Sequence, residues 1–121
     1  TRLFATLPRL DRPQALALAE LAAARGAAET FDLLVTLIDL FLARLARSGA
    51  TGAIPPEAAP NEAQLIARLA PGPDEARAWA ELAQSLSARA RRGKAVNLDP
   101  AALLLDILLK IDETAGTLAQ R

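Results

Sequence analysis

Residues 94–114 read "KAVNLDPAALLLDILLKIDET", which predicts a loop followed by a leucine-rich helix. Asp99 suits the N-cap position, and Pro100 suits the first helical position, where its missing N–H costs no hydrogen bond. One face of this helix carries the residues that we expect in the core: Leu103, Leu104, Ile107, Leu108 and Ile111. Leu105 and Leu109 lie beside that face, so the apolar arc is wider than one buried face needs. The helix is therefore expected either to be central to the domain or to be covered by another chain.

The same excess of apolar residues occurs at residues 29–49, "ETFDLLVTLIDLFLARLARSG", which predict a helix ended by Gly49. Its core face repeats with helical period through Phe31, Leu34, Val35, Ile38, Leu42 and Leu45. Leu33, Leu37 and Leu40 add a further apolar flank. These three leucines, like Leu105 and Leu109, are predicted either to form an interface or to be buried within a larger core.

Helical patterns fill most of the remaining sequence. We expect the tail of a helix over residues 1–7, a helix over 11–26 capped by Asp11 and ended by Gly26, a short helix capped by Asn61, and a helix over 73–93. Residues 48–60, rich in Gly and Pro, predict a loop. Alanine and leucine dominate and β-branched residues are sparse, which disfavours strands. The sequence predicts an all-α fold, an irregular bundle of about five to six helices forming one domain over residues 1–121.

Composition argues against most enzyme chemistry. The chain has no His and no Cys, so it lacks the commonest general base, the thiolate nucleophile and the usual transition-metal ligands. Asp32 and Asp39 share a helix face but lie about 10 Å apart along the axis, too far to share an ion. A Ser–Lys pair using Lys94 or Lys110 stays formally open. We expect no catalytic residues, no metal site, no cofactor and no enzymatic activity in this chain.

Charge and hydropathy limit the partners. Lys plus Arg number 14 and Asp plus Glu number 14, so we expect little or no direct binding of nucleic acid. The basic cluster "ARARRGK" at residues 88–94 either contacts a partner or neutralises the dipole of its own helix. No apolar run reaches the roughly 20 residues needed to span a bilayer, and the expected location is cytoplasmic. The absence of Met predicts a piece of a longer chain.

A resemblance narrows the function. "WAELAQSLSARARRGKAVNLDPAALLLDILLKIDETA" at residues 79–115, preceded by "LPRLD" and by "ALALAELAAARGAAETFDLLVTLIDLFLARLAR", resembles the C-terminal end of delta prime subunits of bacterial DNA polymerase III clamp loaders. Clamp loaders are pentamers whose C-terminal helical domains form a collar. The resemblance implies a collar domain without nucleotide chemistry, whose partners are the delta and gamma/tau subunits of the loader.

The expected subunit interface combines the two leucine flanks and the basic helix end, because a ring subunit needs two different contact surfaces. Its candidate residues are Leu33, Leu37, Leu40, Arg89, Arg91, Arg92, Leu105 and Leu109.

A second class of protein also fits the composition. Ligand-binding and dimerisation domains of helical transcriptional regulators are likewise rich in Ala and Leu and all-helical. Such a domain needs a pocket between helices with a few polar groups. The sequence offers scattered candidates for that role, namely Thr36, Trp79 and Gln84.

Overall fold

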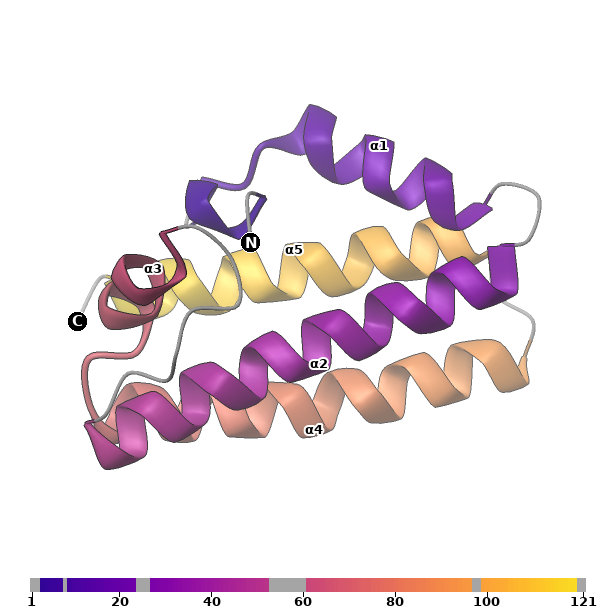
Figure 1. Ribbon diagram of the computed structural model, residues 1–121. Coiled ribbons are helices and arrows are strands. Elements are labelled where there is room, and N and C mark those ends of the chain that lie inside the picture. The colour runs from indigo at the N-terminus through magenta and orange to yellow at the C-terminus, as the bar shows by residue number, and fades with distance from the viewer. Residues whose placement is uncertain (1–2, 8, 24–26, 53–60, 97–98, 120–121) are drawn as a thin grey trace.

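Helices make up nearly all of the chain that the structure describes, residues 3–7, 9–23, 27–52, 61–96 and 99–119 of a computed structural model (Figure 1). The elements are the 3-10 helix η1 (Phe4–Thr6) and the α-helices α1 (Arg12–Ala23), α2 (Ala27–Thr51), α3 (Glu62–Leu69), α4 (Pro73–Ala95) and α5 (Pro100–Ala119). Within these ranges there is no strand. The predicted all-α bundle of about five to six helices is confirmed.

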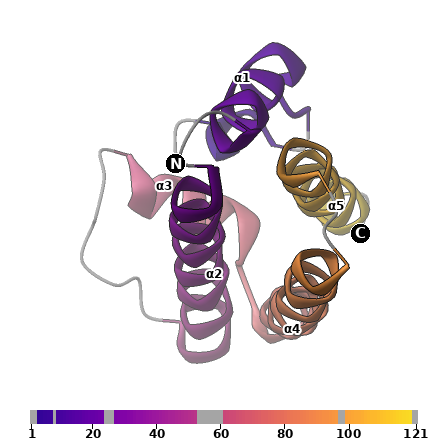
Figure 2. The same cartoon turned by 90° about the vertical axis from the view of Figure 1, so that its right-hand side faces the viewer.

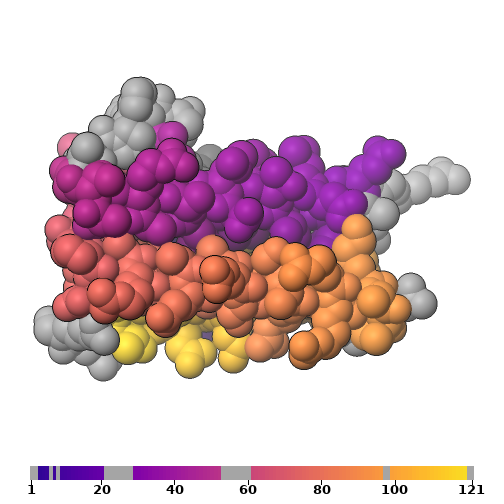
Figure 3. Space-filling model, turned by 90° about the horizontal axis from the view of Figure 1, so that it is seen from below, coloured from indigo at the N-terminus to yellow at the C-terminus, as the bar shows by residue number. Residues whose placement is uncertain are grey.

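The four long helices α1, α2, α4 and α5 surround a common core, and α3 lies at one end of them (Figure 2). Neighbouring helices run in opposite directions: α2 packs along α4, and α1 along α5. Figure 3 shows the face on which α2 and α4 lie side by side. Two polar contacts join distant segments, from Lys94 Nζ to Asp32 Oδ1 at 2.6 Å and from the Leu10 N–H to Asp112 Oδ1 at 3.0 Å.

The core follows the predicted helix faces closely. All five residues of the predicted face of α5 are buried, which confirms that part of the pattern. On α2, four of the six predicted core residues are buried, namely Phe31, Ile38, Leu42 and Leu45, whereas Leu34 and Val35 are half-buried against the core. Phe41, which the predicted face did not include, is also buried. Trp79 of α4 is completely buried, and its indole N–H donates a 2.8 Å hydrogen bond to the carbonyl of Leu69. This bond satisfies the polar atom of an otherwise apolar side chain.

The predicted end of α2 at Gly49 is wrong. The helix continues to Thr51, and Gly49 is buried inside it, facing the start of α4. A Cβ at this position would lie 2.8 Å from both the Ala76 Cβ and the Gly72 carbonyl oxygen, so glycine permits the close approach of α2 and α4. The helix is instead followed by Gly52, whose φ of 76° suits a residue without a side chain.

The predicted helix caps have mixed outcomes. Asp11 caps α1 as expected, accepting a hydrogen bond from the Gln14 N–H at 3.1 Å. Asn61 precedes α3 but makes no side-chain cap; its φ of 65° places it in the left-handed region, which Asn tolerates better than most residues. Gly26, residues 53–60 of the predicted loop, and Asn97 with Leu98 of the loop predicted before α5 lie outside the described residues.

In the described part of the N-terminal segment, the predicted helix tail over residues 1–7 is present only as the single 3-10 turn η1, after which Leu7 is extended. Phe4 stacks on Phe41 of α2 with ring centroids 4.8 Å apart. The guanidinium of Arg68 donates hydrogen bonds to the carbonyls of Leu7 at 2.6 Å and Ala5 at 3.1 Å. These contacts hold the segment between α2 and α3, where it forms one wall of the surface described next.

Candidate interaction surface

A row of exposed leucines follows one side of α2. Leu33, Leu37 and Leu40 are 59%, 51% and 56% exposed. Their spacing of four and then three residues places them on one helix face, separate from the face that enters the core. Large apolar side chains scattered singly on a surface need no explanation, but a continuous row marks a candidate interaction site.

Two leucines of the row, Leu37 and Leu40, lie at an apolar groove of 610 Å³, whereas Leu33 is not among the residues that line it. Leu37 and Leu40 line it from α2, and Phe4 and Leu18 line it from the N-terminal segment and α1. At the C-terminal end of α2 the lining becomes charged, through Arg44, Arg47 and Glu62. The groove therefore has apolar sides and one polar end, the composition typical of a protein-binding groove.

The polar end contains a buried ion pair that the sequence pattern did not reveal. The Glu62 side chain, only 4% exposed, pairs with the guanidinium of Arg44, whose Nε lies 2.7 Å from Glu62 Oε1. Glu62 begins α3, so the pair ties α3 to α2. A charge this buried is tolerated because its partner is close and hydrogen-bonded.

Breaking this pair should destabilise the fold. We expect Arg44→Ala and Glu62→Ala each to lower the free energy of unfolding by about 2 kcal/mol, because each leaves an uncompensated charge. The double substitution should lower the free energy of unfolding by less than the sum of the two single losses, and the difference should be about 1 kcal/mol or more. Urea unfolding of the parent chain, the two single variants and the double variant measures this coupling.

As the control, Ala substitutions of the exposed pair Arg77 and Asp74, 3.7 Å apart, should change the free energy of unfolding by less than about 0.5 kcal/mol. Strict additivity at Arg44 and Glu62 would contradict the expectation.

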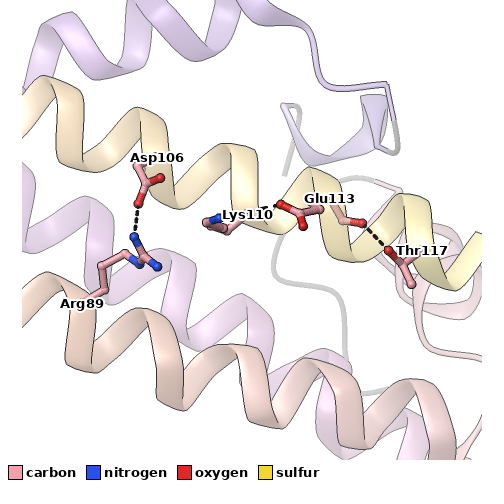
Figure 4. Close-up of polar contacts among 5 residues, drawn as sticks. All are labelled: Arg89, Asp106, Lys110, Glu113 and Thr117. Carbon is pink, nitrogen blue, oxygen red and sulfur yellow. Dashed lines mark hydrogen bonds and ion pairs between the residues drawn. The ribbon is translucent and has the colours of Figure 1, made fainter.

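Most of the basic cluster is engaged within the chain. Arg89 Nη1 lies 2.8 Å from Asp106 Oδ2 of α5 (Figure 4), and Arg91 Nη1 donates to Ser87 Oγ at 3.1 Å. Arg92 is exposed beside a shallow hollow of 410 Å³ that Val96 also lines. The three candidate arginines therefore stay at the surface, with Arg89 also joining α4 to α5.

Leu105 and Leu109 lie in a different setting from the leucines of α2. Both are half-buried and pack against the core. Substitutions at these two positions would therefore perturb packing as well as any contact with a partner. The structure places the predicted interface residues in separate regions: Leu37 and Leu40 line the groove, Leu33 is exposed on the same face of α2, and the other candidates lie on α4 and α5.

The polar candidates for a ligand pocket do not converge. Thr36 lines a 200 Å³ cavity between α2, α4 and α5, together with Asp39 and Ser87. Trp79 is buried in the core, and Gln84 is exposed. The cavity is smaller than the roughly 300–1,000 Å³ usual for ligand sites.

Within the described ranges, no three or more Asp or Glu residues are placed to hold a metal ion. No helix in that part of the chain has the length and hydrophobicity needed to cross a membrane. No family model, curated protein or solved structure matches this chain.

Proposed function

We propose that this chain is a non-catalytic collar domain of a delta prime subunit, which helps to hold together the clamp loader used by bacterial DNA polymerase III in DNA replication. The observation that carries the proposal is the exposed row Leu33, Leu37 and Leu40, because it needs a covering partner. The resemblance of residues 79–115 to delta prime C-termini supports a neighbouring loader subunit as that partner.

The arrangement of surfaces is compatible with a ring. Each subunit of a heterologous ring contacts two neighbours through two different surfaces. The groove beside α2 supplies one, and the flank of α5 with Leu105 and Leu109, near the arginines of α4, supplies the other. In this role the domain is cytoplasmic, its partners are the delta and gamma/tau subunits, and it needs no cofactor and little contact with nucleic acid.

Mixing experiments test the proposal. Size-exclusion chromatography with light scattering is applied to this chain alone and mixed with full-length delta and gamma/tau subunits of the same organism, each at tens of micromolar. We expect a larger species only in the mixtures, because the apolar surfaces then become covered. Failure to associate, together with a stable homodimer and thermal stabilisation by small molecules, would contradict the proposal and favour a ligand-binding domain of a transcriptional regulator.

A further inference from the structure

The exposed row on α2 continues as a heptad pattern. Thr30, Leu33, Leu37, Leu40, Arg44 and Arg47 are separated alternately by three and four residues, the spacing of the contact positions of a coiled coil. At 3.6 residues per turn, this seam lies roughly 120° around the axis from the core face of α2. The helix therefore has two separate contact faces: one enters the core, and the other presents the three exposed leucines and ends near Arg44, which pairs with Glu62 of α3.

The seam has the dimensions of a site for one helix. Leu33 and Arg47 are fourteen residues apart, about 21 Å or four helical turns. Across the groove from Leu37 and Leu40, Phe4 and Leu18 provide a second apolar wall. A helix lying between these walls could insert its side chains between the leucines of α2, as in helix-in-groove complexes.

The charges at the two ends of the seam set the direction of such a helix. Glu29 lies exposed in the first turn of α2, and Arg47 lies exposed near its C-terminal end. Acidic residues and the positive end of the dipole occur at helix N-termini, and basic residues occur at C-termini. An antiparallel helix would bring its acidic first turn to Arg47 and its basic last turn to Glu29. A parallel helix would place like charges together at both ends.

We propose that the groove beside α2 binds one amphipathic helix of a neighbouring clamp-loader subunit, antiparallel to α2, with leucine or isoleucine at heptad spacing and an acidic residue in its first turn against Arg47. This inference rests on the proposed function and adds to it the face that is covered and the chemistry of the covering segment.

Affinity measurements with the full-length delta and gamma/tau subunits test the inference. Leu37→Asp should weaken binding of one of these subunits by roughly 100-fold, as expected for the centre of an apolar contact. Arg47→Glu should weaken it by about tenfold and reduce its salt dependence. The matched controls are Leu16→Asp, at a leucine 49% exposed on α1 outside the groove lining, and Arg77→Glu on α4. Both controls should bind like the parent chain, and all variants should keep its thermal midpoint within a few degrees.

The direction of the helix has its own measurement. The chain contains no Cys, so a benzophenone attached to Leu33→Cys or to Arg47→Cys reports a single position. Cross-links from position 47 should map to the first turn of a helix in the neighbour, and cross-links from position 33 to residues about fourteen positions further along that same helix. The opposite order would overturn the antiparallel arrangement.

The outcomes separate this inference from the proposed function. If the parent chain binds neither subunit, the proposed function fails. If the parent chain binds and Leu37→Asp and Arg47→Glu bind equally well, the function stands and the groove inference is wrong. If the chain alone forms a dimer that Leu37→Asp abolishes, and the same variant still binds the loader subunits, a second copy occupies the groove and the inference is overturned.

Discussion

Trp79→Ala is expected to lower the free energy of unfolding by about 4 kcal/mol, a large share of the roughly 5–15 kcal/mol that stabilises a domain. The indole is completely buried, and its N–H donates to the Leu69 carbonyl at 2.8 Å. The substitution therefore opens a cavity between α3, α4 and α5 and leaves the carbonyl without its donor. Trp79→Phe retains most of the ring and should cost about 1–3 kcal/mol, the penalty for one unpaired buried group.

Urea unfolding followed by circular dichroism measures both losses, since the substitutions remove the sole tryptophan and with it the fluorescence signal. Val96→Ala, at a side chain 61% exposed, serves as the control and should change stability by less than about 0.5 kcal/mol. Equal costs for Trp79→Ala and Trp79→Phe would show that ring volume contributes nothing, against the packing described here.

The buried residues of this fold could be predicted where the spacing of apolar residues along one helix face determines which of them enter the core. The prediction of the core face of α5 is correct because Leu104 and Leu108 follow the helical period of a face that is buried on one side. Gly49 could not be predicted, because a glycine within a helix and a glycine ending one look alike in sequence. The difference lies in Gly72 and Ala76, more than twenty residues away, whose atoms occupy the space of a side chain at position 49.

The candidate surface was predictable only in part, for a related reason. Leu33 and Leu105 carry the same signal, an apolar residue beside a core face, yet Leu33 is exposed and Leu105 is half-buried. Exposure depends on where the other helices pack, which periodicity does not encode. The opposite wall of the groove comes from Phe4, and its polar end from Glu62, residues separated along the chain and joined to α2 only by folding.

The expected consequence of Gly49→Val is a loss of about 3 kcal/mol of unfolding free energy. A Cβ at position 49 would lie 2.8 Å from the Gly72 carbonyl oxygen, a backbone atom at the start of α4 that cannot rotate away. Relief therefore requires α2 and α4 to separate, which weakens the most extensive helix–helix packing among the described residues. Gly93 provides the matched control, since a Cβ there would meet the Leu103 side chain at 2.5 Å, and the flexible end of that side chain can change rotamer.

Gly93→Val should accordingly cost about 1 kcal/mol, because the Leu103 side chain must move aside and the higher helix propensity of valine relative to glycine offsets part of that loss. Thermal and urea unfolding of the two variants compare a steric clash with a backbone atom, at position 49, with a steric clash with a side chain, at position 93. Both positions lie within α-helices. A smaller loss for Gly49→Val than for Gly93→Val would mean that α2 and α4 are not held together at Gly72. In that case the groove beside α2 would lose its rigid support, because the same helix presents Leu33, Leu37 and Leu40 on its other side.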